Sequence, residues 1–136
     1  MSALTPELFW LALTAILAGS LWFPYVVMSS SGSNKQYTSF DRLPRIDEMS
    51  DMTQRSWRAH LNLLEQFLPF AVLVLIAHAI GLSNWVTVTA TCAFFWIRVL
   101  HAAGYITGIA KMPLRPILHM ASWLCFVAMA IAVLVG

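Results

Sequence analysis

The sequence predicts an all-α fold, an integral membrane four-helix bundle in which residues 1–136 form a single domain. Composition is the first reason: 60% of the residues are hydrophobic and only 10% are charged, whereas a soluble domain carries about 25% charged residues. The second reason is four separate apolar runs, each long enough for a helix that crosses a bilayer. The third is that polar or turn-forming residues separate these runs.

The four expected helices cover residues 6–28, 51–80, 84–109 and 114–135, and residues 29–50 form the one long loop. Thr5 suits the N-cap of the first helix, because Pro6 then takes the first helical position. Pro24 is expected to kink that helix near its end. No Lys or Arg precedes the first apolar run, so this run is predicted to be a retained helix and not a signal peptide.

The positive charges predict the orientation in the membrane. Lys and Arg residues lie in or beside the first and third loops, whereas the second loop and both termini have none. Positively charged loops stay in the cytoplasm, so both termini are expected on the non-cytoplasmic side. The short terminal segments and the lack of a transit peptide favour a bacterial inner membrane as the location.

The first cluster of polar residues opens the second helix. Arg58, Asn62 and Glu65 are spaced i, i+4, i+7 and therefore share one helix face. A cation, an amide and a carboxylate on one face suit a polar, zwitterionic ligand, with ion pairs between helices as the alternative. Glu65 favours the ligand, because attraction to lipid headgroups does not explain an acid within an apolar run. Arg55 is interpreted as an arginine that reaches the headgroups.

The second cluster closes the third helix, where Arg98, His101 and Tyr105 are spaced i, i+3, i+7. An arginine within a membrane helix should face the bundle interior or a water-filled cavity. A structural salt bridge from Arg98 to Glu65 is the alternative, and it is compatible with a ligand site. Arg115 begins the fourth helix, either as an interfacial charge or as a cation directed into the mouth of the bundle.

Other classes of site are disfavoured by the same sequence. His60, His78 and His119 have no polar companions on their predicted faces, so they are expected to pack and not to bind a ligand. No spacing typical of metal ligands is present, and there is no phosphate-binding loop or catalytic triad. A net charge of +2 is too small to indicate a nucleic-acid partner.

Both clusters resemble motifs of one protein family. Residues 58–65, Arg-Ala-His-Leu-Asn-Leu-Leu-Glu, are similar to the R-A-x-x-N-x-x-E signature of the MAPEG family, the membrane-associated proteins of eicosanoid and glutathione metabolism. Residues 98–105 resemble the third-helix motif of that family, R-x-x-H/Y-x-x-x-Y. The resemblance, with both motifs at this separation, covers nearly the whole chain. The chain is similar in type to a bacterial member of the family that resembles microsomal glutathione S-transferases.

The resemblance implies a homotrimer with glutathione sites between neighbouring subunits, near the cytoplasmic side. Glutathione, as co-substrate, would be bound by six residues: Arg58, Asn62, Glu65, Arg98, His101 and Tyr105. Arg115 matches the arginine that activates the glutathione sulfur in the family and is the candidate catalytic residue. The second substrate would be a lipophilic electrophile or hydroperoxide that enters from the membrane lipid, which implies a transferase or peroxidase.

Two other functions are compatible with the same residues. A non-catalytic member of the fold would use its polar clusters to hold the trimer together or to bind another anion. A small transporter is the third possibility, but it requires an ionisable group near the bilayer midplane. Glu65 lies near one end of its helix, which disfavours transport.

Overall fold

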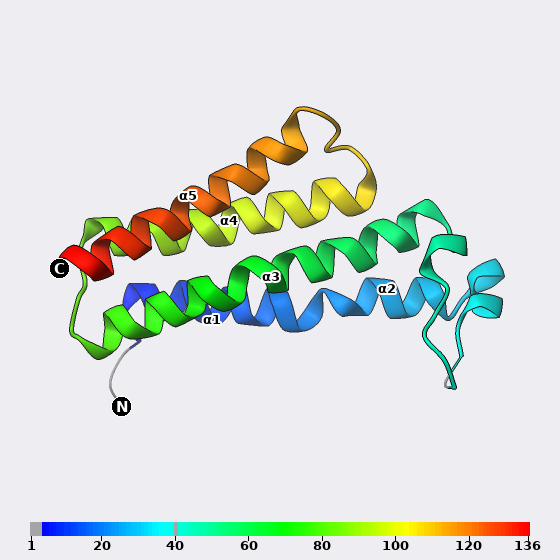
Figure 1. The fold of residues 1–136 in the computed structure, drawn as a ribbon, viewed down its shortest axis with the longest axis horizontal. Coiled ribbons are helices and arrows are strands. Elements are labelled where there is room, and N and C mark those ends of the chain that lie inside the picture. Colours follow the sequence, from blue (N-terminus) through cyan, green and yellow to red (C-terminus); the bar gives the residue numbers. More distant parts are fainter. Residues whose placement is uncertain (1–3, 40) are drawn as a thin grey trace.

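The computed structural model describes residues 4–39 and 41–136, and it confirms the predicted all-α membrane fold. The described residues contain no strand. Four long apolar segments could each cross a membrane: Pro6–Ser29, Asp51–Ala79, Trp85–Thr107 and Leu114–Val135. Figure 1 shows these segments as a long bundle, with two short 3₁₀ helices, η1 (Gly32–Tyr37) and η2 (Ile46–Glu48), at one end.

The first membrane segment is divided into two helices, α1 (Pro6–Ser20) and α2 (Trp22–Ser29). Thr5 is the N-cap of α1, and its hydroxyl accepts a hydrogen bond of 3.4 Å from the Leu8 amide. The division follows from Pro24, which has no N–H to donate to the Ser20 carbonyl four residues earlier. The expected kink near the end of this segment is therefore a break at Leu21, before the proline.

Helix α3 (Asp51–Ala79) has 29 residues, so it is about 43 Å long at 1.5 Å per residue. That length exceeds the ~30 Å hydrocarbon layer, so one end of α3 extends to the headgroups or beyond. The long loop folds back onto this end. Asn34 donates to the Thr53 hydroxyl at 3.0 Å and accepts from the Ser50 amide at 2.9 Å.

Helices α4 (Trp85–Thr107) and α5 (Leu114–Val135) complete the bundle. Asn84 caps α4, and its side chain accepts from the amides of Val86 and Thr87 at 2.9 and 3.1 Å. Gly108 ends α4 with a φ of 77°, a left-handed conformation that glycine adopts without strain. Helix α4 is shorter at both ends than the expected range 84–109, because Asn84 and Gly108 act as its caps. Helix α5 has the expected range, 114–135.

The apolar core lies on the faces of α3 and α4 that meet. The rings of Phe70 and Phe94 stack with 4.0 Å between centroids and 9° between planes. Leu11, Val74 and Met129 pack around them. Many large apolar side chains on the outer faces are exposed, as expected of surfaces that lie against lipid.

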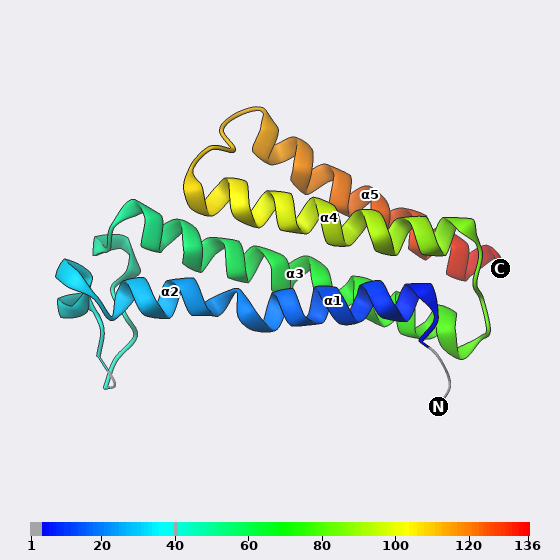
Figure 2. The ribbon, with the colours of Figure 1, turned by 180° about the vertical axis from the view of Figure 1, so that it is seen from behind.

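Helix α5 packs on α4 and α3, and α1 and α2 lie along the other side of α3. Figures 1 and 2 show that α5 lies close to α4 near the C-terminus and diverges from it toward residue 114. We call the end with η1, η2 and the α4–α5 connection the loop end. The opposite end, with the start of α1 and the α3–α4 connection, is the turn end.

Candidate functional site

The two predicted clusters meet inside the bundle through Arg98, whose side chain is only 1% exposed. Arg98 Nη2 donates to Asn62 Oδ1 at 2.9 Å, and Nη1 donates to Gln66 Oε1 at 3.2 Å. Asn62 and Gln66 are four residues apart on α3, so one guanidinium reaches both. Arg98 thus joins the motif on α3 to the motif on α4.

The alternative salt bridge between Arg98 and Glu65 does not form. Within residues 4–39 and 41–136, the one salt bridge joins Arg45 and Glu48 at 2.8 Å. Glu65 is exposed and precedes Gln66 by one position, which on a helix turns its side chain about 100° away from Gln66. Arg98 therefore pairs with neutral amides, and Glu65 lies on the outer face of α3.

Gln66 extends this network to α5, where Arg115 was the only residue expected to belong to a site. Ser122 Oγ donates to Gln66 Oε1 at 2.7 Å, and Gln66 Nε2 lies 3.0 Å from His119 Nε2. The expectation that His119 lacks polar companions is wrong, because its companions come from another helix. Its signal was the i, i+4, i+7 spacing of Arg115, His119 and Ser122, the same spacing that marked the first cluster.

A cavity of about 340 Å³ opens where α5 diverges from α4 near the loop end. Its polar wall holds Asn62, His101, His119 and Arg115, and its apolar wall consists of Met112, Pro116 and Met120. His101 is 3% exposed, and its ring centroid lies 6.4 Å from that of His119. The cavity places one cation and several hydrogen-bonding groups opposite apolar side chains.

Tyr105 connects this cavity to a second hollow. The Arg115 guanidinium carbon lies 4.2 Å from the centroid of the Tyr105 ring, within the range of a cation–π contact. Tyr105 also lines a more open hollow of about 500 Å³ together with Arg58 and Arg55. Arg55 Nε donates to the Ile106 carbonyl at 3.2 Å, so this arginine binds the C-terminal end of α4 and does not only reach toward headgroups.

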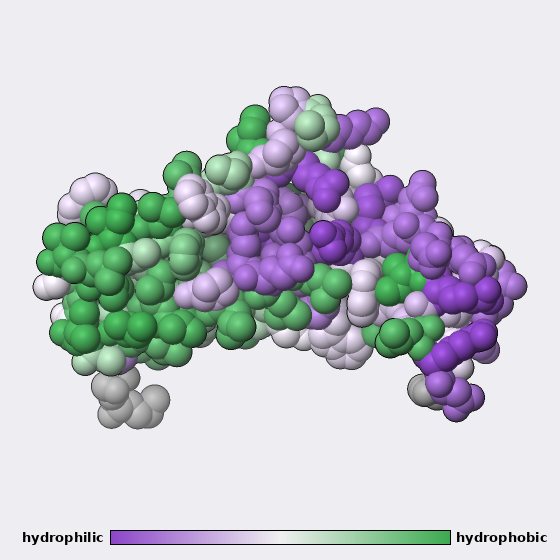
Figure 3. Space-filling model, viewed as in Figure 1, coloured by the Kyte–Doolittle hydropathy of each residue, from purple (hydrophilic) through white to green (hydrophobic). Residues whose placement is uncertain are grey.

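The structure divides the seven predicted site residues between three neighbouring hollows. Asn62, His101 and Arg115 line the first, with Arg98 directly behind Asn62. Arg58 and Tyr105 line the second. Glu65 lines a third of about 210 Å³ beside Gln66 and Trp123. On the face of the bundle drawn in Figure 3, hydrophilic residues extend from the loop end to the middle of the bundle, whereas the turn end is mostly hydrophobic.

Among the residues that the structure describes, no three His, Cys, Asp or Glu side chains are grouped so that they could hold a metal ion. A search of curated proteins finds no match to this chain. The model of the MAPEG family matches residues 8–135, nearly the whole chain. Four membrane-length helices and this match together show that the chain is an integral membrane protein and belongs to the MAPEG family.

Proposed function

We propose that this protein binds glutathione as co-substrate and uses its sulfur to attack lipophilic electrophiles or to reduce hydroperoxides. One observation carries the proposal: the cavity between α4 and α5 joins the Arg115 cation to an apolar wall. Members of the MAPEG family generally use glutathione, and a thiolate beside a membrane-facing apolar wall can meet a substrate dissolved in lipid.

Glutathione carries two carboxylates and one ammonium at neutral pH, and the three hollows offer groups of the required charge. Arg58 can bind a carboxylate, since arginine forms paired hydrogen bonds with it. Glu65 can accept from the ammonium. Asn62 and His101 supply further hydrogen bonds, and Arg98 acts mainly by fixing Asn62.

Glu65 and Arg58 support a trimer as the active form. Both side chains are exposed on the outer face of α3, and charged groups at the level of lipid are costly unless something polar covers them. Glutathione and a neighbouring subunit would cover them together. The site is then incomplete in one chain, and the neighbouring subunit would complete it around Arg58 and Glu65.

Arg115 is the proposed catalytic residue. A thiol with a pKa near 8.5 is mostly protonated at neutral pH, and a nearby cation favours the thiolate. The thiol proton leaves to solvent, and the sulfur lone pair forms a bond to the electrophilic carbon while a leaving group departs. With a hydroperoxide, the thiolate attacks the O–O bond and releases an alcohol. A second glutathione then forms the disulfide and releases water.

Stopped-flow absorbance at the thiolate band tests this role, with glutathione mixed into purified protein in detergent. We expect a saturable signal that falls about tenfold in Arg115→Ala, since a neighbouring cation lowers the pKa of a thiol by about one unit or more. Lys111→Ala is the matched control, because Lys111 is an exposed cation of the same loop that does not line the cavity. A full signal in Arg115→Ala would disprove the assignment.

A non-catalytic role remains as the second candidate, and a specific observation favours it. The two Nη groups of Arg98 are satisfied by Asn62 and Gln66, which is the arrangement expected of a contact that holds helices together. Glu65→Gln separates the two roles. A glutathione site predicts loss of binding by calorimetry with the trimer intact in analytical ultracentrifugation, whereas a structural role predicts loss of the trimer.

The location and orientation belong to the same proposal. We infer a bacterial inner membrane, with the loop end in the cytoplasm where glutathione is available. Of the eight Lys and Arg residues, none lies in α1 or in the α3–α4 connection at the turn end, which supports the positive-inside orientation. Protection of a cysteine introduced at Ser83 from membrane-impermeant thiol reagents added to the cytoplasmic side would support it; labelling from that side would contradict it.

A further inference from the structure

A buried carboxylate lies at the turn end, far from the polar network around Arg98. Glu7, in the first turn of α1, is 3% exposed. Its Oε1 accepts hydrogen bonds from Ser83 Oγ at 2.8 Å and from Thr87 Oγ1 at 2.6 Å. Its Oε2 is buried and has no hydrogen-bond partner among the described residues. Half of this carboxylate is therefore unsatisfied.

Both side chains that donate to this carboxylate are electrically neutral. Glu7 lies at the N-terminal end of α1, and Thr87 belongs to the first turn of α4, so the positive ends of two helix dipoles face it. Both hydroxyl groups donate to it. No Lys or Arg lines the adjoining space. A buried charge without a full set of partners is costly, so a positively charged donor is the missing component.

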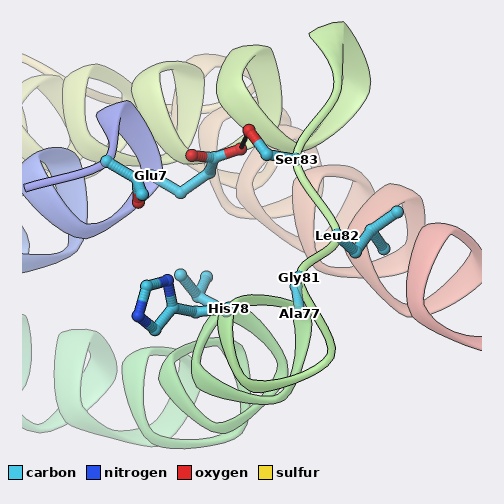
Figure 4. Close-up of a pocket in the computed structure, with 8 residues that line it drawn as sticks. Glu7, Ala77, His78, Gly81, Leu82 and Ser83 are labelled. Carbon is cyan, nitrogen blue, oxygen red and sulfur yellow. Dashed lines mark hydrogen bonds between the residues drawn. The ribbon is translucent and has the colours of Figure 1, made fainter.

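A cavity of about 180 Å³ lies next to Glu7 and has room for such a donor. In Figure 4, Glu7 extends from α1 toward Ser83 along one side of this space, and His78 of α3 lies on the opposite side. Thr5 and Ser83 add hydroxyl groups to the lining, and the remaining walls are apolar: Val74, Ala77 and Leu82. The C-terminal end of α3, which carries partial negative charge, also borders the cavity.

We propose that this cavity binds a primary ammonium group on a short alkyl chain. An ammonium has three N–H donors, and the side chains of Glu7, Thr5 and His78 that line the cavity carry oxygen or nitrogen atoms able to accept them. The apolar walls suit the adjoining methylene groups. A bare metal cation fits less well, because Ca²⁺ or Mg²⁺ requires six or more oxygen ligands, and the Ala77 and His78 carbonyls already accept from Leu82 and Gly81.

Two sources can supply this group, and the position of the cavity admits both. It lies at the end of the bundle, where lipid headgroups meet water, so the ammonium of phosphatidylethanolamine can reach it from the membrane. A small soluble amine can reach it from the aqueous side. The proposal concerns the chemistry that both share, and it is independent of glutathione binding.

Native mass spectrometry and thermal unfolding of the full chain in detergent test the proposal. The probes are phosphatidylethanolamine against phosphatidylcholine, and free ethanolamine against tetramethylammonium at equal concentration. The choline headgroup and the tetramethylammonium ion have no N–H, so their binding reports the attraction between charges without any hydrogen bond. We expect the primary ammonium to bind about tenfold more tightly than the quaternary form, since only the primary ammonium can donate hydrogen bonds to the carboxylate.

Glu7→Gln keeps the size of the side chain and removes its charge, and we expect it to abolish this preference. Glu48→Gln is the matched control, because it makes the same change on an exposed acid at the loop end. His78→Leu removes one acceptor and leaves the hydrogen bonds of Glu7 in place, so it keeps the test valid if Glu7→Gln does not fold. We expect it to weaken binding severalfold.

Preference for phosphatidylethanolamine would identify a lipid site, and a response to ethanolamine alone would identify a soluble amine; both support the proposal. No preference for either primary ammonium in the wild type would overturn it. A preference that persists in Glu7→Gln would overturn it as well, and so would undiminished binding in His78→Leu if only that variant folds.

Discussion

The two ends of the bundle each bury an ionised group, but they satisfy it differently. At the loop end, the Arg98 guanidinium meets amide oxygens of α3, and one of these amides is held in turn by α5. At the turn end, the Glu7 carboxylate meets two hydroxyl groups that lie four residues apart in the chain, Ser83 and Thr87. The first group holds three helices together, whereas the second attaches α1 to a single turn.

This difference separates architecture from binding. Because Arg98 has partners on its two Nη groups, its removal leaves several buried groups without partners. Because Glu7 keeps an unpaired oxygen beside a cavity, the turn end has unused capacity for a ligand. The substitutions below test whether the loop end is the more cooperative of the two.

Arg98→Ala is expected to have the largest effect. It leaves Asn62 and Gln66 without their donor and opens a space in a fully buried position, so we expect a loss of about 3–5 kcal/mol of stability. The measurement is the melting temperature of the protein in detergent. Arg42→Ala, at an exposed position of the long loop, is the control and should melt like the wild type. Equal melting of both variants would contradict the structural role of Arg98.

Thr87→Val tests the turn end, and we expect it to reduce stability less than Arg98→Ala does. It keeps the shape of the side chain and removes the 2.6 Å hydrogen bond to Glu7, so we expect a loss of about 1–3 kcal/mol. Thr91→Val is the matched control, one turn further along α4 and equally buried at 0% exposure. The Thr91 hydroxyl donates only to carbonyls of its own helix, so its loss should be smaller. The reverse order would show that Glu7 does not depend on Thr87.

A double-mutant cycle gives the smallest expected effect and the most direct comparison. Gln66→Leu and Ser122→Ala remove two members of one hydrogen-bonded network, so we expect a coupling energy of about 1 kcal/mol. Gln66→Leu combined with Thr87→Val should be additive within about 0.5 kcal/mol, since the two sites share no partner. Coupling of equal size in both cycles would show that the two ends are not independent.

The sequence predicted the helices well because its signals there are local. Length and hydropathy predicted four membrane segments, and Thr5 followed by Pro6 marked the start of the first helix through cap chemistry. The break at Leu21 differs from the expected position of the kink by a few residues, because the lost hydrogen bond of Pro24 belongs to the residue four positions earlier.

The site was predicted only as far as helix periodicity reaches. Spacing within one helix placed Arg58, Asn62 and Glu65 on one face, and Arg98, His101 and Tyr105 on another. It could not show that Gln66, on a neighbouring position of α3, is the residue that links Arg98 to Ser122 and His119. Contacts between helices depend on how each helix is rotated, and periodicity leaves that rotation free.

By itself, the sequence determined that the chain crosses a membrane four times and that its basic residues gather toward one end, because hydropathy and charge act at each residue independently of the fold. Tertiary structure alone decided which of the polar side chains meet. It paired Arg98 with amides instead of Glu65, and it enclosed Glu7 with Ser83 and Thr87 at the opposite end. A hydrogen bond requires atoms within about 3 Å, and only the packing of one helix against another sets that distance.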